Sequence, residues 1–324
     1  MSDRANEAEL VGTREHMRPT TFPHLAVTAG LGVVFLVALY SIAGAHQIHD
    51  FGAVWALLLS ALAFLLSLLV TPRNFTVGFL TSLLPLLLVW RIAAMAGGKS
   101  VPDVDGGVDW TITGPRPWAL MVVCGAVTIL YIIEFAQTWR NDVSHRGAGR
   151  WLANLVWGAT LIRIWFGFNE IGHASEKIFA GHDSWAYMAN QVFGPMGDKA
   201  VAPFSLLGSA PGLFVVLAGI IELAFGLGIG FGFMTRLAGV GGILYLLIAT
   251  LFYGGEWLNG YGWAGGGWEY PMLLIVFLTS FVLTGPGPFS IDLDLRSRNA
   301  LPSWMRPLSI PKSTDTAYSG TVTR

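Results

Sequence analysis

Cysteine and charged residues are scarce in this chain of 324 residues. Cys124 is the only cysteine, which excludes a disulfide bond within the chain, a cysteine-cluster metal site and an iron–sulfur centre. Charged residues make up only 12% of the chain, whereas 53% of the residues are hydrophobic. This composition indicates an integral membrane protein, with the lipid bilayer as its surroundings and no nucleic acid among its partners.

Long apolar runs take the place of the missing charge. Eight segments approach or exceed the roughly 17 to 25 residues needed to cross a hydrocarbon core. They are residues 24–44, 51–71, 75–96, 117–137, 151–173, 209–232, 234–254 and 269–285. None shows the strict alternation of a membrane β-barrel, so each segment must satisfy its backbone hydrogen bonds as a helix. The sequence predicts an all-α, polytopic membrane protein with about eight transmembrane helices.

Lysine and arginine are distributed unevenly between the connecting segments. If the N-terminus lies inside, the inner segments carry thirteen of these residues and the outer segments carry four. Because Lys and Arg accumulate in cytoplasmic loops, both termini are predicted to be cytoplasmic, in a multi-pass protein of the cell inner (plasma) membrane. No small-residue cleavage site follows the first apolar segment, so we expect the first helix to be retained.

The polar stretch 138–150 separates two halves that differ in kind. The predicted organisation is a cytoplasmic N-terminal segment, a four-helix membrane region, a cytoplasmic linker, a second four-helix membrane domain and a disordered cytoplasmic tail. Their bounds are 1–23, 24–137, 138–150, 151–295 and 296–324. Residues 180–208 mix aromatic and polar side chains, which favours a partly helical segment on the outer surface. The acidic loop 97–116 is expected to be solvated rather than to bind calcium, and we predict no metal site.

Charged side chains within the apolar segments need a partner or a purpose, since each costs at least about 2.5 to 3.5 kcal/mol in a bilayer. Arg91, near the end of the third segment, can extend to the headgroups. Arg163 and Glu222 are predicted near mid-membrane, counting about 1.5 Å per residue from the two sides. We therefore predict an ion pair between them, serving either to lock two helices together or in a redox or proton-relay role.

A second polar group is predicted near the outer boundary. Glu170 and His173 share one helix face. His173 is either an interfacial hydrogen-bonding residue or a proton-transfer group assisted by the flanking acids. Glu269, in the run GWAGGGWEYP at residues 262–271, is either a stabilising first-turn acid or a member of the same outer site. The glycines between 219 and 232 allow close helix packing or make room for a flat ligand.

The C-terminal half resembles the DoxX family, and more closely its larger DoxD-type relatives, the large subunit of thiosulfate:quinone oxidoreductase. The resemblance rests on RIWFGFNEIGHASEKI, GIIELAFGLGIGFGFMTRLAG, GWAGGGWEYP and GPGPFSIDLDL, and covers about residues 151–295. It implies a four-helix membrane unit that works with quinone in a redox complex, in some cases oxidising thiosulfate to tetrathionate. By motif position it implies that Glu222, Arg236, Trp268 and Glu269 are family residues.

The favoured interpretation is a membrane subunit that passes electrons to quinone together with a partner redox subunit. His173, Glu170, Glu222 and Glu269 are the candidate catalytic residues, and Arg163, Arg236 and Trp268 the candidate quinone-binding residues. Thiosulfate is a possible donor, although the predicted outer segments hold nine acids against four Lys and Arg, which is poorly suited to a dianion. The alternatives are a non-catalytic anchor or assembly factor for a soluble redox partner and, with less support, a small-solute transporter.

Overall fold

The computed structural model describes most of the chain. The described residues are 21–43, 51–97, 116–144, 150–179, 182–198, 209–253, 256–262, 267–298 and 300–309. Throughout these ranges the regular structure is helical, and no strand occurs in them. The acidic loop 97–116, predicted not to bind calcium, lies largely outside the described residues. So do the linker residues 145–149 and the last fifteen residues of the tail.

Four long helices make up the N-terminal half. They are α2 (Thr21–Ala43), α3 (Phe51–Leu69), α4 (Phe75–Gly97) and α5 (Arg116–Ser144). Each packs on two of the others, α2 on α3 and α5, and α4 on α3 and α5, so they form an antiparallel bundle. Helix α5 continues through Ser144, so residues 138–144 of the predicted linker are helical. Hydropathy marks the apolar part of a helix and not its polar last turns.

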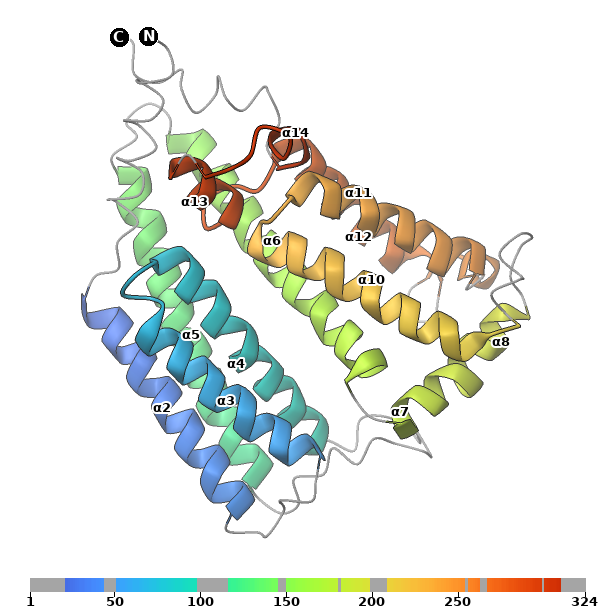
Figure 1. The fold of residues 1–324 in the computed structure, drawn as a ribbon, viewed down its shortest axis with the longest axis horizontal. Coiled ribbons are helices and arrows are strands. Elements are labelled where there is room, and N and C mark those ends of the chain that lie inside the picture. The colour runs from blue at the N-terminus through green and yellow to red at the C-terminus, as the bar shows by residue number, and fades with distance from the viewer. Residues whose placement is uncertain are drawn as a thin grey trace.

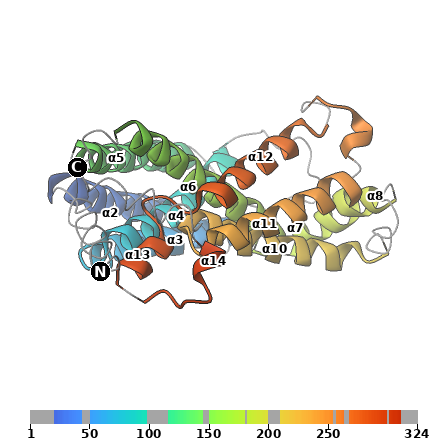
Figure 2. The ribbon, with the colours of Figure 1, turned by 90° about the horizontal axis from the view of Figure 1, so that it is seen from above.

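The C-terminal half is built on four further helices. These are α6 (Arg150–Ile178), α10 (Pro211–Phe231), α11 (Thr235–Leu246), which continues as the π-helical turn η4 (Leu247–Tyr253), and α12 (Glu269–Thr284). In Figures 1 and 2, α6 lies between the N-terminal bundle and the pair α10 and α11. The two ends of α6 serve below to name the faces of the molecule, as the Arg150 side and the Ile178 side.

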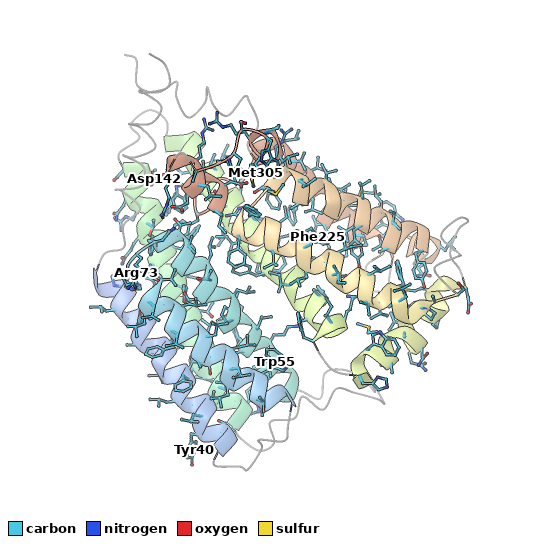
Figure 3. The ribbon with its side chains drawn as sticks, in the orientation of Figure 1. Tyr40, Trp55, Arg73, Asp142, Phe225 and Met305 are labelled. Carbon is cyan, nitrogen blue, oxygen red and sulfur yellow. The ribbon has the colours of Figure 1, made fainter. Side chains whose placement is uncertain are left out.

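Short helices cover both sides. On the Ile178 side, α7 (His182–Tyr187), the π-helical η3 (Met188–Phe193) and α8 (Gly194–Gly197) occupy the region predicted to be partly helical, and η5 (Glu256–Asn259) follows η4. On the Arg150 side lie α13 (Ile291–Ser297) and α14 (Arg306–Ser309), so the beginning of the predicted tail is folded. Trp55 marks the Ile178 side in Figure 3, and Asp142 and Met305 mark the Arg150 side.

The predicted fold class, an all-α polytopic membrane protein, is confirmed. Among the described residues, α2, α3, α4, α5 and α10 are long and apolar enough to cross a membrane, and α11 with α12 are shorter apolar helices. The remaining predicted span is α6, whose 29 residues include several charges. All eight predicted segments are therefore helices in the structure.

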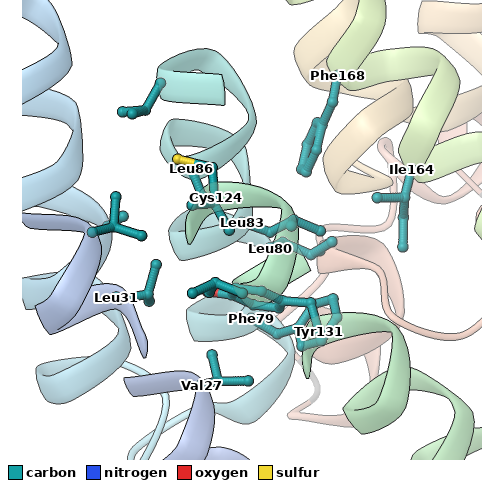
Figure 4. Close-up of a cluster of buried hydrophobic side chains, with 14 of the residues drawn as sticks. Val27, Leu31, Phe79, Leu80, Leu83, Leu86, Cys124, Tyr131, Ile164 and Phe168 are labelled. Atoms are coloured by element: carbon teal, nitrogen blue, oxygen red, sulfur yellow. The ribbon is translucent and has the colours of Figure 1, made fainter. Parts of the chain in front are cut away.

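A continuous apolar core fills the N-terminal bundle and extends to α6. Figure 4 shows Leu31 of α2, Phe79 of α4 and Tyr131 of α5 in one cluster, with Phe168 of α6 beside it. The Tyr131 hydroxyl donates to Ser82 Oγ at 2.6 Å. Cys124 is a buried free thiol in the same cluster. A lone buried cysteine of this kind is a small apolar side chain.

Helices α6 and α10 approach closely because glycine lines their contact. A Cβ added to Gly167 would collide with the backbone of Gly230, and one added to Gly226 would lie 3.0 Å from the Gly167 carbonyl oxygen. Gly226 and Gly230 form the small-residue spacing that allows membrane helices to meet backbone to backbone. These contacts support the packing interpretation of the α10 glycines over a flat-ligand site.

Candidate functional site

Arg163 does not pair with Glu222, and the prediction of that ion pair is wrong. The Arg163 side chain is 1% exposed and lies at the end of α10. Its Nη1 donates to the carbonyl oxygens of Ile229 and Gly230 at 2.5 and 2.9 Å, and its Nη2 donates to the Phe289 carbonyl oxygen at 2.7 Å. Arg163 thus binds the carbonyls at the end of α10 and joins them to the segment that precedes α13.

The error came from the assumed register of α6. A helix of 29 residues is about 43 Å long, which exceeds a hydrocarbon core of about 30 Å. Counting depth from its first residue therefore placed Arg163 too deep. In the structure Gly167 faces Gly226 and Gly230, and Gly226 faces Glu170. Arg163 is consequently level with the last turn of α10, and Glu222 lies a turn beyond Gly226 toward the Ile178 side.

Arg236 belongs to the same Arg150-side junction. Its Nε donates to the Val282 carbonyl oxygen at 3.0 Å and its Nη1 to the Pro307 carbonyl oxygen at 2.7 Å. Nearby, the Asp292 carboxylate accepts from the backbone N–H of Met234 at 3.0 Å and of Thr235 at 3.3 Å. It therefore caps the start of α11, where Met234 has a φ of 48°. Burial raises the pKa of Asp292, against the lowering effect of these hydrogen bonds.

Glu222 lies in a separate buried group toward the Ile178 side. Its carboxylate accepts from Lys177 Nζ at 2.8 Å and from the Tyr245 hydroxyl at 2.6 Å. The side chains of Lys177 and Glu222 are each only 8% exposed. Arg236 is nine positions before Tyr245 in α11, about 13 Å along the helix. The structure therefore separates Arg163 and Arg236 from Glu222.

Glu170 and His173 adjoin this group, as the helical spacing predicts. Glu170 is 4% exposed, and His173, Glu222 and Lys177 lie close enough to interact with it electrostatically. His173 is half-buried, with its Nδ1 at 3.8 Å from a carboxylate oxygen of Glu176. These residues form one group across α6, α10 and α11, which we call the carboxylate cluster: Glu170, His173, Glu176, Lys177, Glu222 and Tyr245.

Arg91 of α4 extends the carboxylate cluster into the N-terminal half. It forms an ion pair with Glu176 rather than reaching only to the headgroups. Arg91 Nε is buried and makes no hydrogen bond within the described part of the chain. The contact is the ion pair that joins α4 to α6, and it leaves one guanidinium donor available for another acceptor.

Glu269 and Trp268 lie at the start of α12. The backbone N–H groups of Gly267, Trp268 and Glu269 donate to the carbonyls of Gly262, Gly260 and Tyr261 at 3.0, 3.2 and 3.1 Å. The Trp268 ring meets the Tyr261 ring edge-on at 4.8 Å between centroids. Glu269 itself is exposed. The described part of GWAGGGWEYP is therefore a turn into a helix, as the glycines and aromatics predict.

Tyr270, the next residue, faces the carboxylate cluster. It hydrogen-bonds to the side chain of Asn169, and the charges of Glu170 and Arg91 act on it. The sequence interpretation chose Glu269 in this run because a carboxylate is the obvious titratable group. One residue along a helix is a rotation of about 100°, so Tyr270 points in a different direction from Glu269.

A large apolar cavity of about 710 Å³ lies between α4, α5 and α6. Tryptophan is prominent in its walls, as Trp90, Trp139, Trp157 and Trp165. Asn154 lines it toward the Arg150 side, and Arg91, Asn169 and Gly172 line it toward the Ile178 side. From Asn154 to Gly172 the cavity follows α6 for about 27 Å. We call this space the interhelix cavity.

A smaller cavity of about 160 Å³ adjoins the Arg91–Glu176 pair on its other face. Trp55 of α3 and Phe179 beyond α6 form part of its wall, and their ring centroids are 6.3 Å apart. Arg91 is in the wall of both cavities. The sequence prediction placed a quinone ring among the last four helices, whereas the walls of the interhelix cavity include α4 and α5 as well.

Three residues of this site were missed or assigned another role from the sequence: Arg91, Tyr245 and Tyr270. The signal for Arg91 was a cation inside an apolar helix, which in a membrane indicates a partner. Tyrosine in an apolar helix carries no comparable signal, because it packs as an aromatic side chain in most positions. Which acid each of these three residues contacts depends on the register between neighbouring helices, and hydropathy does not predict that register.

Comparison with known proteins agrees with the sequence resemblance at the level of the family. The comparison with curated proteins gives no match, and neither does the comparison with solved structures. A protein-family model, that of the DoxX family, does match the chain, at residues 158–255. This range covers most of α6, all of α10 and α11, and the segments between them. Glu170, His173, Lys177, Glu222 and Tyr245 all lie within it. Residues 158–255 of this membrane protein are thus a DoxX family domain.

Proposed function

We propose that this protein binds a membrane quinone in the interhelix cavity and works as the membrane subunit of a redox complex. The observation that carries the proposal is the cavity itself, an apolar space of about 710 Å³ with Arg91 at one end. A quinone has a flat ring, polar carbonyl oxygens and a long apolar tail. The cavity offers aromatic walls, a hydrogen-bond donor and a length of about 27 Å along α6.

The residues at the Ile178-side end fit a quinone headgroup. Arg91 Nε is a buried donor that makes no hydrogen bond within the described residues, and the Asn169 side chain lies in the same wall. An unpaired buried donor costs free energy until an acceptor reaches it, so a carbonyl oxygen there would be stabilised. The four tryptophans provide faces on which a ring or isoprenoid chain packs.

The chain's contribution to the reaction is to bind, orient and shield the acceptor. When bound, quinone supplies a two-electron, two-proton acceptor, and the electrons come from a partner redox subunit. Thiosulfate is the donor that the resemblance suggests, with two thiosulfate ions giving one tetrathionate and two electrons. Arg91 and Lys177 are already paired with Glu176 and Glu222, so thiosulfate oxidation is assigned to the partner rather than to these cations.

Tryptophan fluorescence tests quinone binding directly. A quinone analogue with a short tail, added to the purified protein in mild detergent, should quench the fluorescence of the cavity tryptophans in a saturable manner. Gly158→Phe should abolish this quenching, because Gly158 lines the cavity and has open space around a Cβ. Gly241→Phe is the matched control, since Gly241 of α11 also has open space but lies outside the cavity wall.

The headgroup position is tested by Arg91→Gln. Loss of a charged donor should weaken binding of the analogue by about tenfold or more, corresponding to about 1.5 to 3 kcal/mol. Arg73→Gln serves as control, because Arg73 lies in the turn before α4 and bonds the Leu69 carbonyl. Saturable quenching that is unaffected by both Gly158→Phe and Arg91→Gln would place the quinone elsewhere, and no quenching at all would contradict the proposal.

A non-catalytic anchor is the second candidate, and the Glu222 contacts favour it. Lys177 and Tyr245 satisfy the hydrogen-bonding needs of Glu222 in a buried group. A group that only holds helices together would have the same contacts. In that case Glu222→Gln lowers the amount of folded protein and a stable soluble partner co-purifies with the chain. Quinone binding that survives loss of the partner would favour the redox role.

A further inference from the structure

The carboxylate cluster and Arg91 together carry an unbalanced charge. The acids are Glu170, Glu176 and Glu222, and the permanent cations are Arg91 and Lys177. Tyr245 and Tyr270 add no charge as neutral hydroxyls. Glu269 and His182 are exposed to solvent and are not counted. Counted this way, the group has one negative charge too many, and a net charge at membrane depth is costly.

One additional proton makes the group neutral. Glu222 accepts hydrogen bonds from Lys177 and Tyr245, and Glu176 pairs with Arg91, so each of these two carboxylates already has a cationic partner. Lys177 directs its hydrogen bonds to Glu222 and the His173 carbonyl, not to Glu170. The positions left for the proton are the imidazole of His173 and the carboxyl group of Glu170. Either placement gives the same total charge.

We propose that His173 and Glu170 share one exchangeable proton and pass it from the Ile178 side toward the interhelix cavity. His173 is half-buried and Glu170 is almost fully buried, one helical turn further in. Moving the proton between them leaves the group neutral, so the transfer needs no other charge to move. His173 is the acceptor from solvent, and Glu170 is the internal donor.

A route from Glu170 to the cavity is present in α12. Tyr270 lies close to Glu170 and hydrogen-bonds to Asn169, which lines the cavity. A tyrosine hydroxyl both donates and accepts, so it can take a proton from Glu170 as it gives its own toward the cavity. This inference rests on the proposed quinone role. A two-electron reduction of quinone takes two protons. For each proton, the Tyr270 O–H bond breaks as an O–H bond forms on a quinone oxygen, and the Glu170 O–H bond breaks as Tyr270 regains its proton. His173 then passes its proton to Glu170 and takes another from solvent.

Infrared spectroscopy can locate the shared proton without quinone or an electron donor. A protonated carboxyl group in an apolar site gives a C=O stretching band distinct from that of a carboxylate. His173→Gln should show this band at neutral pH, because the proton then has only Glu170 to occupy. Glu170→Gln in that background should remove it. Glu134→Gln is the matched control, since Glu134 is a buried glutamate 3.7 Å from a histidine in the N-terminal bundle.

Each outcome decides the proposal. A band lost with Glu170→Gln but kept with Glu134→Gln supports it. A His173→Gln protein without any protonated-carboxyl band overturns it, as does a band whose intensity is unchanged when Glu170 is replaced. The wild-type and His173→Gln spectra suffice if Glu170→Gln fails to fold. Absence of quinone quenching would defeat the proposed function while leaving these spectra unchanged, so the two failures can be told apart.

The route through Tyr270 to the interhelix cavity is tested by a separate measurement. Electrochemical reduction of a bound short-tail quinone analogue at neutral pH should change the Glu170 carboxyl band in the His173→Gln protein. Tyr270→Phe should suppress that change while leaving fluorescence quenching intact, because it removes only the hydroxyl between Glu170 and Asn169. A band change that is the same with and without the Tyr270 hydroxyl would rule out this route.

Discussion

Lys177 and Glu222 form a buried pair whose members depend on each other. Lys177→Met would leave the Glu222 carboxylate with only the Tyr245 hydroxyl, and removal of one member of a buried pair costs about 3 to 5 kcal/mol. We expect a correspondingly lower midpoint for denaturant unfolding in detergent. The double variant Lys177→Met/Glu222→Gln should recover much of the loss, since no uncompensated charge remains. A Lys177→Met protein as stable as the wild type would show that the pair is solvated.

Asp292 is the acid on the Arg150 side whose titration should affect stability. Burial raises its pKa, so the folded state keeps the proton to a higher pH than the unfolded state, where the pKa is about 3.9. The stabilising contribution of protonated Asp292 to the free energy of unfolding is therefore full below that pH. It is lost as the pH rises through the folded-state pKa.

Asp292→Asn should remove this decline, which unfolding midpoints measured from about pH 4 upward would reveal. Asp294→Asn is the control, because Asp294 pairs with Arg298 near the surface of the same short helix. If the slope persists in Asp292→Asn and vanishes in Asp294→Asn, the assignment to the buried acid fails.

Single residues also show where sequence reasoning stops. The helical spacing of Glu170 and His173 was sufficient to place them together, because residues three apart on a helix share a face. The pairing of Arg163 and Glu222 needed the register between α6 and α10, which Gly167, Gly226 and Gly230 set through backbone contact. The roles of Arg91 and Tyr270 needed the packing of α4 and α12 against α6.

At the scale of elements, all eight predicted membrane segments correspond to helices. The largest differences are at polar ends, where α5 and α6 run on to Ser144 and Ile178. Apolar length identifies a helix that must satisfy its backbone in lipid, but it does not report polar turns beyond the bilayer. The π-helical turn Leu247–Tyr253 was also beyond prediction, because nothing in its apolar composition distinguishes it from α-helix.

The contact between α6 and α10 should be sensitive to a single methyl group. Gly167→Ala places a Cβ against the backbone of Gly230, which has no rotamer that could relieve the clash. Overpacking of this kind costs about 1 to 3 kcal/mol, so the unfolding midpoint should fall. Gly158→Ala in the same helix should keep or raise stability, since its Cβ meets nothing and alanine favours helix. Equal effects of the two variants would contradict the close approach.

On the scale of the whole molecule, the chain returns at Phe289 to join its two halves. The centroid of the Phe289 ring lies 5.4 and 4.8 Å from the ring centroids of Phe75 and Phe79 in α4. It lies 5.6 Å from the ring centroid of Trp157 in α6. Its carbonyl oxygen accepts from Arg163, and its φ is 55°. The GPGPFSIDLDL motif therefore binds α4 and α6 on the Arg150 side. The Arg91–Glu176 pair joins the same two helices toward the Ile178 side.

These two connections lie toward opposite ends of the interhelix cavity, so the fold and the proposed site depend on the same contacts. The sequence could not predict this arrangement, because it assigned the polar functions to the last four helices and no separate function to the first four. The cytoplasmic position of both termini stays a prediction from the distribution of Lys and Arg. It places the carboxylate cluster toward the outer face and the Phe289 junction toward the cytoplasm.

Phe289→Ala should weaken both stability and quinone binding. Removing a buried phenylalanine ring costs about 3 to 5 kcal/mol, and here the loss loosens α4 against α6 at one end of the cavity. Phe281→Ala is the matched control, because Phe281 is as deeply buried but packs on Phe166 within the C-terminal half. Both variants should unfold more easily, but only Phe289→Ala should reduce quenching by the quinone analogue. If the two variants bind the analogue equally well, the junction is not what holds the cavity together.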